Sequence, residues 1–401
     1  MSTSDMTSPE IAGLLARLLD PGQNAETPSE FLGRQFDLGL AWVHFRAGDG
    51  GIGGSSALQQ TVERAIVAAG SPVAFHGNPL GVGMVAPTIH DHGTQYQCQR
   101  LLRPLFTGEE VWCQLFSEPG AGSDLASVAT SAVRAPDGSW VVNGAKVWTS
   151  YAHKAAWGLL LARTDPDQPK HKGLTMFLVE MSAPGVEIRP LYQMTGDAEF
   201  NEVFLNDVVV QDRHRLGAVG DGWRVVLTTL LNERVAIGGQ VPARGEGLIG
   251  HLMQAWQDAQ SEGSTRPELL DELMKLWIRA EALRLFNAHS AATRDDASGP
   301  GPEGWISKLS DAELNLELTS LALDVLGPAG LLKPDGYPLA RSSRSPFDYA
   351  GVQNAFLRAR ANPIEGGTSE IARNVIGERL LRLPGEPRVD KDVAWSQVPR
   401  G

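Results

Sequence analysis

The spacing of apolar residues changes along the chain near residue 111 and again near residue 222. Before residue 111 the apolar positions recur with the period of a helix. The segment 56–69 places Leu58, Val62, Ile66 and Val67 on one helical face. The stretch 94–106 has the same spacing and is closed by Thr107-Gly108. We therefore predict a mainly helical region up to residue 112.

Between about residues 111 and 211 the apolar positions alternate with polar ones, which is the pattern of half-buried strands. Asn143-Gly144, within the segment 140–148, is a dipeptide typical of a tight hairpin turn, and we predict a hairpin there. Pro136-Asp137-Gly138 predicts a second turn. Several short strands at close spacing indicate a small β-barrel or sandwich.

Helical spacing returns at Gly222 and continues to the end of the sequence. Candidate helices are 222–260, 267–293, 303–326, 351–361 and 368–383. Long helices with short connections favour an antiparallel bundle. The chain is thus predicted to be an α+β multidomain protein. Its predicted parts are an N-terminal helical domain, 1–112, a middle β domain, 113–221, and a C-terminal helical bundle, 222–401.

The charge and composition of the chain exclude several classes of ligand and of protein. The net charge of −12 argues against non-specific binding of nucleic acid or of an anionic membrane. Cys98 and Cys113 are too few for a disulfide scaffold, and no metal-binding motif is found. The chain shows no export signal and no apolar run as long as a membrane span, so we expect a cytoplasmic protein.

The stretch 116–124, Phe-Ser-Glu-Pro-Gly-Ala-Gly-Ser-Asp, has glycines two residues apart at Gly120 and Gly122. The third glycine of a dinucleotide-binding loop is missing, and no β-α-β pattern surrounds the stretch. What remains is a strand that ends in a Pro-Gly turn. Its backbone amides and the hydroxyls of Ser117 and Ser123 can hydrogen-bond the edge of a heteroaromatic ring or a phosphate.

Three stretches together resemble the acyl-CoA dehydrogenase family. The first is 116–124, similar to the family's T/S-E-P-x-A-G-S-D. The second is 144–150, similar to G-x-K-x-W-x-T/S. The third is 366–371, similar in part to E-G-T-S/N-E/Q-I. The resemblance implies the helical–β–helical order given above and an FAD held between the β domain and the bundle.

The resemblance also implies roles for single residues. Those that would contact the flavin ring are Phe116, Ser117, Trp148 and Ser150. Gly122 and Ser123 would line the region of the flavin and the CoA ester. Thr368 and Glu370 would lie near the ribityl and phosphate part of the cofactor. A lone tryptophan is more often part of a β core, but the matched stretch favours Trp148 as a flat face for the flavin.

The reaction that the resemblance implies is α,β-dehydrogenation of an acyl-CoA thioester. A carboxylate removes the α-proton while flavin N5 takes the β-hydride. In many members the base directly precedes Gly-Thr, where this chain has Gly366, and Glu365 is one residue too early. Other members carry the base on a bundle helix in a Glu-Arg pair, which Glu233-Arg234 matches. The backbone N–H of Gly366 would then polarise the thioester carbonyl together with the flavin 2′-hydroxyl.

The helical pattern supports Glu233 independently. Trp223, Val226, Leu227 and Leu230 form an apolar stripe, and Glu233 follows Leu230 by three residues. A carboxylate on a buried face is costly without a partner, and its pKa is expected to be raised toward neutrality. We predict Glu233 as the base, with Arg234 contributing to CoA binding or charge balance. The alternative is a purely structural Glu233–Arg234 ion pair.

Two departures concern the cofactor. The family's Arg-x-x-Phe-Gly stretch, which reaches the FAD of a neighbouring subunit, is absent from 253–263. The family's Gln-x-x-Gly-x-x-Gly is Asp324-x-x-Gly327-x-x-Gly330 here, with Gly327 keeping the backbone permissive beside the cofactor. These changes leave open a homo- or hetero-oligomer, dimer or tetramer.

Three functions remain open at this stage. The leading one is an acyl-CoA dehydrogenase of lipid metabolism that passes electrons to an electron-transfer flavoprotein. The others are a non-catalytic or half-active subunit of a hetero-oligomer, and a related flavin oxidase or monooxygenase. The sequence does not distinguish acyl chain lengths, or CoA from a carrier-protein thioester.

Overall fold

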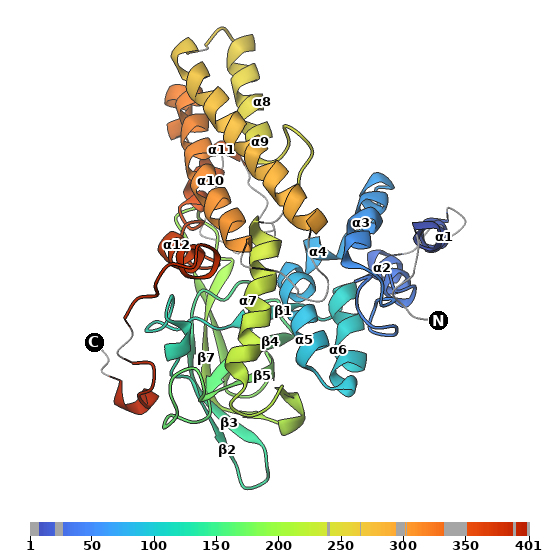
Figure 1. The fold of residues 1–401 in the computed structure, drawn as a ribbon, viewed down its shortest axis with the longest axis vertical. Coiled ribbons are helices and arrows are strands. Elements are labelled where there is room, and N and C mark those ends of the chain that lie inside the picture. Colours follow the sequence, from blue (N-terminus) through green and yellow to red (C-terminus); the bar gives the residue numbers. More distant parts are fainter. Residues whose placement is uncertain are drawn as a thin grey trace. The chain divides into compact units, whose positions relative to one another are not determined.

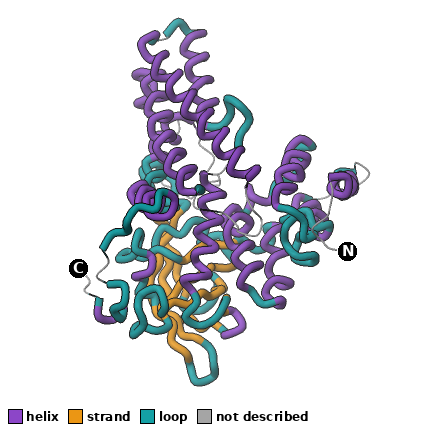
Figure 2. Tube along the Cα trace, viewed as in Figure 1, coloured by secondary structure: helices purple, strands orange, loops and turns teal. Residues whose placement is uncertain are grey.

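The computed structural model describes residues 8–20, 27–238, 241–264, 266–293, 301, 303–332, 351–387 and 390–398. Its contacts divide the chain into two compact units. Figure 1 labels their helices and strands, and Figure 2 colours them by secondary structure. The first contains residues 1–189, 200–232 and 387–401, and the second contains residues 190–199 and 233–386. The first unit thus combines the predicted N-terminal helical region with the predicted β region. The three-domain boundaries given above stay a prediction.

Helices occupy the start of the first unit. They are α1 (Ser8–Leu18), α2 (Pro28–Asp37), α3 (Gln59–Ala68), α4 (Ala74–Gly77), α5 (Ala86–His92) and α6 (Gln95–Thr107), with a π-helical turn at Gly81–Val85. Helix α6 begins at a capping box between Thr94 and Gln97 and ends at Gly108, whose φ is 78°. The helices predicted within 56–69 and 94–106 are confirmed.

The rest of the first unit is built on a mixed sheet. Its strands are β1 (Trp112–Leu115), β2 (Ser131–Arg134), β3 (Trp140–Lys146), β4 (Trp157–Arg163), β5 (Leu174–Glu180), β6 (Val186–Leu191), β7 (Phe200–Val210) and β8 (Arg215–Leu216). The strand order is β6-β7-β3-β2-β4-β5-β8, and β1 pairs in parallel with β4. Figure 2 shows these strands in orange.

The hairpin predicted at Asn143-Gly144 is wrong. Strand β3 runs through both residues, and its pairing with β7 shifts between Val142 and Gly144, which makes a bulge. The Asn143 amide exchanges hydrogen bonds with Asp207 of β7, at 2.9 and 3.0 Å. A Cβ on Gly144 would lie 2.4 Å from the Thr130 hydroxyl. Asn-Gly thus accommodates a bulge and a close neighbour, while the turn predicted at 136–138 joins β2 to β3.

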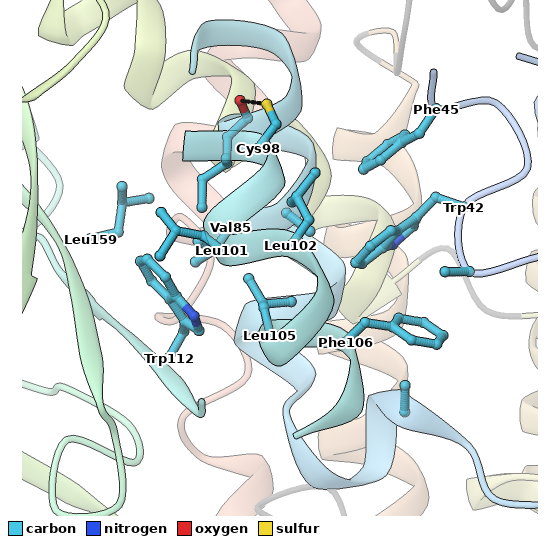
Figure 3. Packing of buried hydrophobic residues seen from close by; sticks show 14 of the residues in the cluster. Trp42, Phe45, Val85, Cys98, Leu101, Leu102, Leu105, Phe106, Trp112 and Leu159 are labelled. Carbon is cyan, nitrogen blue, oxygen red and sulfur yellow. Dashed lines mark hydrogen bonds between the residues drawn. The ribbon is translucent and has the colours of Figure 1, made fainter. Parts of the chain in front are cut away.

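The sheet is buried on both faces, because alternate side chains of β4 enter two different clusters. Leu159 and Leu161 pack with the N-terminal helices, whereas Leu160 and Ala162 pack with the opposite cluster. Figure 3 shows the first cluster, in which Trp112 and Leu159 of the sheet lie on the same side of α6 as Leu101. Cys98 donates to the Ile89 carbonyl at 3.5 Å there. This packing fixes β1, which leads into the 116–124 stretch.

Helix α7 (Gly222–Gly238) begins in the first unit and ends in the second. The second unit continues with α8 (Leu248–Ser261), α9 (Leu270–Thr293), α10 (Gly304–Leu326), α11 (Gly351–Ala359) and α12 (Ser369–Val375), followed by a π-helical turn at Ile376–Leu380. Buried residues of α8, α9 and α10 form its core. Within the described ranges, no helix combines the length and apolar character needed to cross a bilayer.

The single helix predicted over 222–260 is wrong, because α7 and α8 are separate. Pro242 and two glycines with positive φ, Gly245 and Gly247, lie between them. The other helices predicted for the bundle correspond to α9, α10, α11 and α12.

Candidate active site

In the first unit, the stretch 116–124 forms a turn at the end of β1. Glu118 and Ala121 exchange two backbone hydrogen bonds of 3.0 Å, so the chain reverses there. Gly122 and Ser123 are exposed at the edge of this turn. The amide of Val147 donates to the Ser117 carbonyl at 2.9 Å, which brings the second predicted stretch beside the first.

A buried lysine fixes the two stretches to each other. Lys146 is fully buried, and its ammonium donates to Phe116 O (3.0 Å), Glu118 Oε1 (2.8 Å) and Leu161 O (2.9 Å). The Glu118 carboxylate also accepts from the amides of Ala129 and Thr130. Burial lowers the pKa of Lys146 to about 8, against the opposing charge of Glu118. Burial alone would raise the pKa of Glu118, but Lys146 and the hydrogen bonds lower it overall.

Trp148 presents its ring on a strained backbone. Its side chain is 60% exposed and its φ is 58°, a region that large residues rarely adopt. Thr149 is held in place by reciprocal backbone bonds of 3.0 Å with Asn201. The Phe200 ring meets the indole edge-on at 5.9 Å, and Ser150 is half-buried beside them. An exposed flat indole, next to a residue that is bonded to Asn201, is a suitable surface for a planar ring.

In the second unit, Glu233 and Arg234 stand on α7. Arg234 is 5% exposed, and its guanidinium lies over the Trp305 ring at 4.3 Å. Burial lowers the pKa of Arg234 to about 10, and the charge of Glu233 opposes that shift. Glu233 is half-buried. The apolar stripe predicted for α7 is wrong at one position. Leu227 is 41% exposed, whereas Val225, Val226 and Thr229 are buried.

Glu365 has its carboxylate engaged by neighbours. Arg358 donates to both of its oxygens, at 2.9 and 2.8 Å, and Asn362 donates to one of them at 2.8 Å. The Arg358 guanidinium also lies 3.4 Å from Glu199. Burial raises the pKa of Glu199 to about 7, while Arg358 acts in the opposite direction. Glu365 and Arg358 therefore form an ion pair.

The loop that carries Gly366 is held in place by two residues of α10. Gly366 and Gly367 have φ values of 66° and 100°. Lys308 of α10 is 1% exposed, and its ammonium donates to the Gly367 carbonyl. A Cβ on Gly367 would lie 2.7 Å from the Trp305 ring. The position requires glycine, both for its backbone conformation and for the ring packed on it.

The remaining predicted contacts also lie in the second unit. Thr368 caps α12, and its hydroxyl accepts from the Ile371 amide at 3.2 Å. Glu370 is exposed in the first turn of that helix. Gly327 ends α10 with a φ of 56°, and Asp324, one turn earlier, is exposed.

Sequence reasoning gave no role to Lys146, Trp305, Lys308 or Arg358. One signal was available for Lys146, since it occupies an inward position of a strand in which Trp140 and Val142 are also buried. A lysine at an apolar position of an alternating pattern indicates a buried ion pair. Trp305 and Lys308 contact the loop at Gly367, about 60 residues later in the chain, and Arg358 contacts Glu199 as well as the nearby Glu365.

Comparisons with known proteins agree with this architecture. Three family models match the chain: the acyl-CoA dehydrogenase N-terminal domain over residues 5–109, the middle domain over 113–208 and the C-terminal domain over 220–381. The chain is 43% identical to acyl-CoA dehydrogenase FadE34 of Mycobacterium tuberculosis, a match that covers 87% of this chain and 45% of that protein. It is 40% identical to acyl-CoA dehydrogenase IpdE1 of the same organism, over 78% of this chain and 77% of the relative.

Solved structures extend the likeness to the fold. The ChsE4–ChsE5 complex from Mycobacterium tuberculosis matches with a TM-score of 0.71 at 30% identity, over 95% of this chain and all of that one. The Tcur3481–Tcur3483 steroid ACAD matches with a TM-score of 0.71 at 25% identity, over 96% of this chain and all of that one.

The chain belongs to the acyl-CoA dehydrogenase family, whose members are FAD-dependent oxidoreductases that act on CH–CH groups. It spans about half the length of FadE34. The residues present fit the cofactor. The exposed Trp148 indole offers a face to a flavin ring, and the turn at 117–123 offers the exposed Ser123 and the half-buried Ser117 as hydroxyl donors.

Proposed function

We propose that the chain catalyses α,β-dehydrogenation of an acyl-CoA thioester, with Glu233 as the base that removes the α-proton. The observation that carries this proposal is the position of Glu233, which lies half-buried on a helix next to the buried cation Arg234. A carboxylate in such surroundings combines partial desolvation with local charge balance, which suits a general base. The other candidate, Glu365, is bonded through both carboxylate oxygens to Arg358.

Gly366 is proposed to polarise the thioester carbonyl through its backbone N–H. Negative charge develops on that oxygen as the α-proton leaves, so a fixed donor stabilises the transition state more than the ground state. Lys308 and Trp305 restrain the neighbouring residue Gly367 and thereby the peptide that donates. Arg234 is proposed to contribute to CoA binding or to local charge balance.

Bound FAD supplies the two-electron oxidant that accepts the β-hydrogen as hydride. Phe116, Ser117, Trp148 and Ser150 are proposed to hold its ring, with Gly122 and Ser123 at the ester. Gly327, Thr368 and Glu370 are proposed to lie along its ribityl and phosphate part. We further propose an electron-transfer flavoprotein as the acceptor of the electrons.

The test is anaerobic titration of the purified protein with a panel of acyl thioesters while flavin absorbance is followed. The panel contains short- and long-chain acyl-CoAs and a CoA ester of a steroid acid, since one structural relative is named a steroid ACAD. We expect Glu233→Gln to lower the rate of bleaching by at least about a thousandfold. Glu365→Gln keeps most of the wild-type rate.

The two variants are matched because each exchanges one carboxylate for its amide within the same unit. Both should retain FAD and bind CoA, which absorbance spectra and equilibrium dialysis measure. A dead Glu365→Gln beside an active Glu233→Gln reverses the assignment. Rapid reoxidation of the substrate-reduced flavin by oxygen would instead indicate an oxidase or monooxygenase.

A second candidate is a half-active or non-catalytic subunit of a hetero-oligomer. Asp324 stands where the family has a glutamine, and the Arg-x-x-Phe-Gly stretch is absent. The structural relative ChsE4–ChsE5 is a complex of two named chains. Purification of this chain without FAD, together with recovery of FAD and bleaching on mixing with a second acyl-CoA dehydrogenase chain, would support that candidate.

A further inference from the structure

Residues 390–398 lie beyond the three family models, which end at residue 381. They nevertheless belong to the first unit and not to the bundle that precedes them. Ala394 pairs with Pro169 in a short bridge. The amides of Trp395 and Ser396 donate to the carbonyls of Gln168 and Pro166, each at 2.9 Å. The segment is therefore hydrogen-bonded along the loop that follows β4.

Trp395 anchors the segment. It is 9% exposed, and its indole N–H donates to the Ser127 carbonyl at 3.3 Å. Its ring stacks on the guanidinium of Arg163 at 4.5 Å. Arg163 in turn donates to Ala126 O at 2.6 Å and to Val128 O at 3.2 Å. One tryptophan thus secures the backbone of residues 126–128 directly and through Arg163.

Lys170 adds a second attachment. Its ammonium lies 2.9 Å from the Asp124 carboxylate and 2.6 Å from that of Asp390. Asp124 directly follows Ser123 and also accepts from the Ser127 hydroxyl at 2.5 Å. The short helical turn Leu125–Ser127 is consequently held at its start by Lys170 and at its end by Trp395.

We propose that residues 390–398 form a strap that positions Ser123 and so sets the affinity for the thioester. The proposal rests on the proposed function, in which Gly122 and Ser123 line the ester. Ser123 is exposed and is joined to the clamped turn by Asp124, so release of the turn leaves it free to move. Trp395, Lys170 and Arg163 act through other residues and are positioning residues.

The strap is expected to act on binding and not on the chemical step. Its contacts described above are with Arg163, residues 124–128 and the loop 166–170, which hold none of the groups proposed to move a proton. Loss of a positioning contact raises the free-energy cost of ordering the loop on binding. Binding of the ground state and binding of the transition state are then weakened equally. The signature is a raised dissociation constant with an unchanged limiting rate.

The experiment compares four variants in the FAD-loaded protein. Trp395→Ala removes the anchor, Trp395→Phe keeps the ring on Arg163 but lacks the N–H donor, and Lys170→Met removes both ion pairs. Gln397→Ala is the control, because its exposed side chain lies in the same helical turn as Trp395. Stopped-flow absorbance over a range of concentrations of the most active acyl-CoA of the panel measures both the dissociation constant of the thioester and the limiting rate of flavin reduction.

We expect Trp395→Ala to raise the dissociation constant about tenfold, and Trp395→Phe and Lys170→Met about threefold each. The limiting reduction rate at saturation should stay within about twofold of wild type, and Gln397→Ala should match wild type in both. An unchanged dissociation constant, or a fall of the limiting rate alone, overturns the proposal. If Trp395→Ala fails to fold, Trp395→Phe and Lys170→Met still decide the outcome.

Hydrogen exchange separates this inference from the proposed function. In Trp395→Ala, amides of residues 122–128 should exchange faster than in wild type, while those of β4 keep their protection. A wild-type protein that no acyl-CoA bleaches contradicts the proposed function, but exchange in this loop still shows whether the strap holds it. Unchanged exchange in all variants would show that it does not.

Discussion

At the scale of single residues, the partners of a charged group decide its role more than its place in a motif. Glu365 lies next to the expected position of a base, yet Arg358 binds both of its oxygens. Lys146 lies within a stretch noted for its tryptophan, yet it makes three hydrogen bonds that join two stretches of the site. The sequence shows that each position carries a charged side chain, but it does not show which residues that side chain contacts.

Lys146→Met should strongly destabilise the protein. It leaves the Glu118 carboxylate buried without its cation, and breaking such a pair on one side costs about 3–5 kcal/mol. Urea unfolding measures the change. Adding Glu118→Gln should recover part of the loss, because it removes the buried negative charge, although the single amide oxygen can accept from only one of the Ala129 and Thr130 amides.

An exposed ion pair provides the comparison for Lys146. The side chains of Arg189 and Glu187 are 57% and 53% exposed, so Arg189→Ala should change the unfolding free energy by less than about 1 kcal/mol. Equal effects of Lys146→Met and Arg189→Ala would contradict a stabilising role for the buried pair.

Asp311 makes stability depend on pH. Burial raises its pKa to about 7, against the opposing charge of Lys308. A carboxyl whose pKa is raised in the folded state favours folding at low pH, and that contribution is lost as pH rises through about 7. The advantage of Asp311→Asn over wild type in unfolding free energy should be larger at pH about 8 than at pH about 5, by on the order of 1–2 kcal/mol.

Thermal unfolding at the two pH values checks this prediction. Asp271→Asn serves as the control, since that aspartate is 79% exposed on α9 and forms an ion pair with Lys275 on the surface of the helix. A difference between Asp311→Asn and wild type that is the same at both pH values would contradict the burial argument.

At the scale of elements, periodicity located most helices and strands, and its failures have a common cause. Helix α6 and the helices α9 and α10 lie where the apolar spacing placed them. The pair Asn143-Gly144 became a bulge because Asp207 and Thr130 lie beside it, and both are distant in sequence. The interruption between α7 and α8 follows Pro242 and Gly245, local signals that the long apolar pattern obscured.

The loop between α11 and α12 gives a prediction at this scale. Gly367→Ala places a methyl group against the Trp305 ring, at a φ that disfavours any side chain. The loop must shift, and with it the Gly366 amide, so the rate of flavin bleaching should fall at least about tenfold. Stopped-flow absorbance with the most active acyl-CoA measures this rate.

A second substitution separates the effect of the contact between the new methyl group and the Trp305 ring from the effect of the unfavourable φ at position 367. Trp305→Leu combined with Gly367→Ala should recover part of the rate, because the smaller side chain leaves room while the unfavourable φ remains. Gly377→Ala is the matched control, since a Cβ there would lie 3.7 Å from Leu383, an ordinary contact. A slow Gly377→Ala would indicate a general effect of alanine on this part of the chain.

At the scale of the whole molecule, the affinity for FAD is the property that depends most on how the subunits assemble. Asp324→Gln removes a negative charge at the position where the family carries glutamine. If the cofactor's pyrophosphate is held near this position, the dissociation constant for FAD should fall about threefold at low salt. The gain should shrink at about 0.3 M salt, because screening shortens the reach of an exposed charge.

Flavin fluorescence on dilution measures this change, with light scattering to record the mass of the assembly. Glu262→Gln, an exposed charge at the end of α8, is the control. Equal effects of the two substitutions would show that only net charge matters. No effect of Asp324→Gln at any salt concentration would place the phosphates away from this helix end.

The sequence by itself determined the order of helical and β regions and the family, because periodicity and short motifs are local properties of the chain. It also singled out Trp148, Glu233 and Gly366 by their positions in those motifs. Only the tertiary structure decided which charged groups are partnered, that Gly367 is covered by Trp305 and that residues 390–398 return to the loop after Ser123. Such contacts join residues far apart in sequence, and their energies depend on burial and distance, which no local pattern specifies.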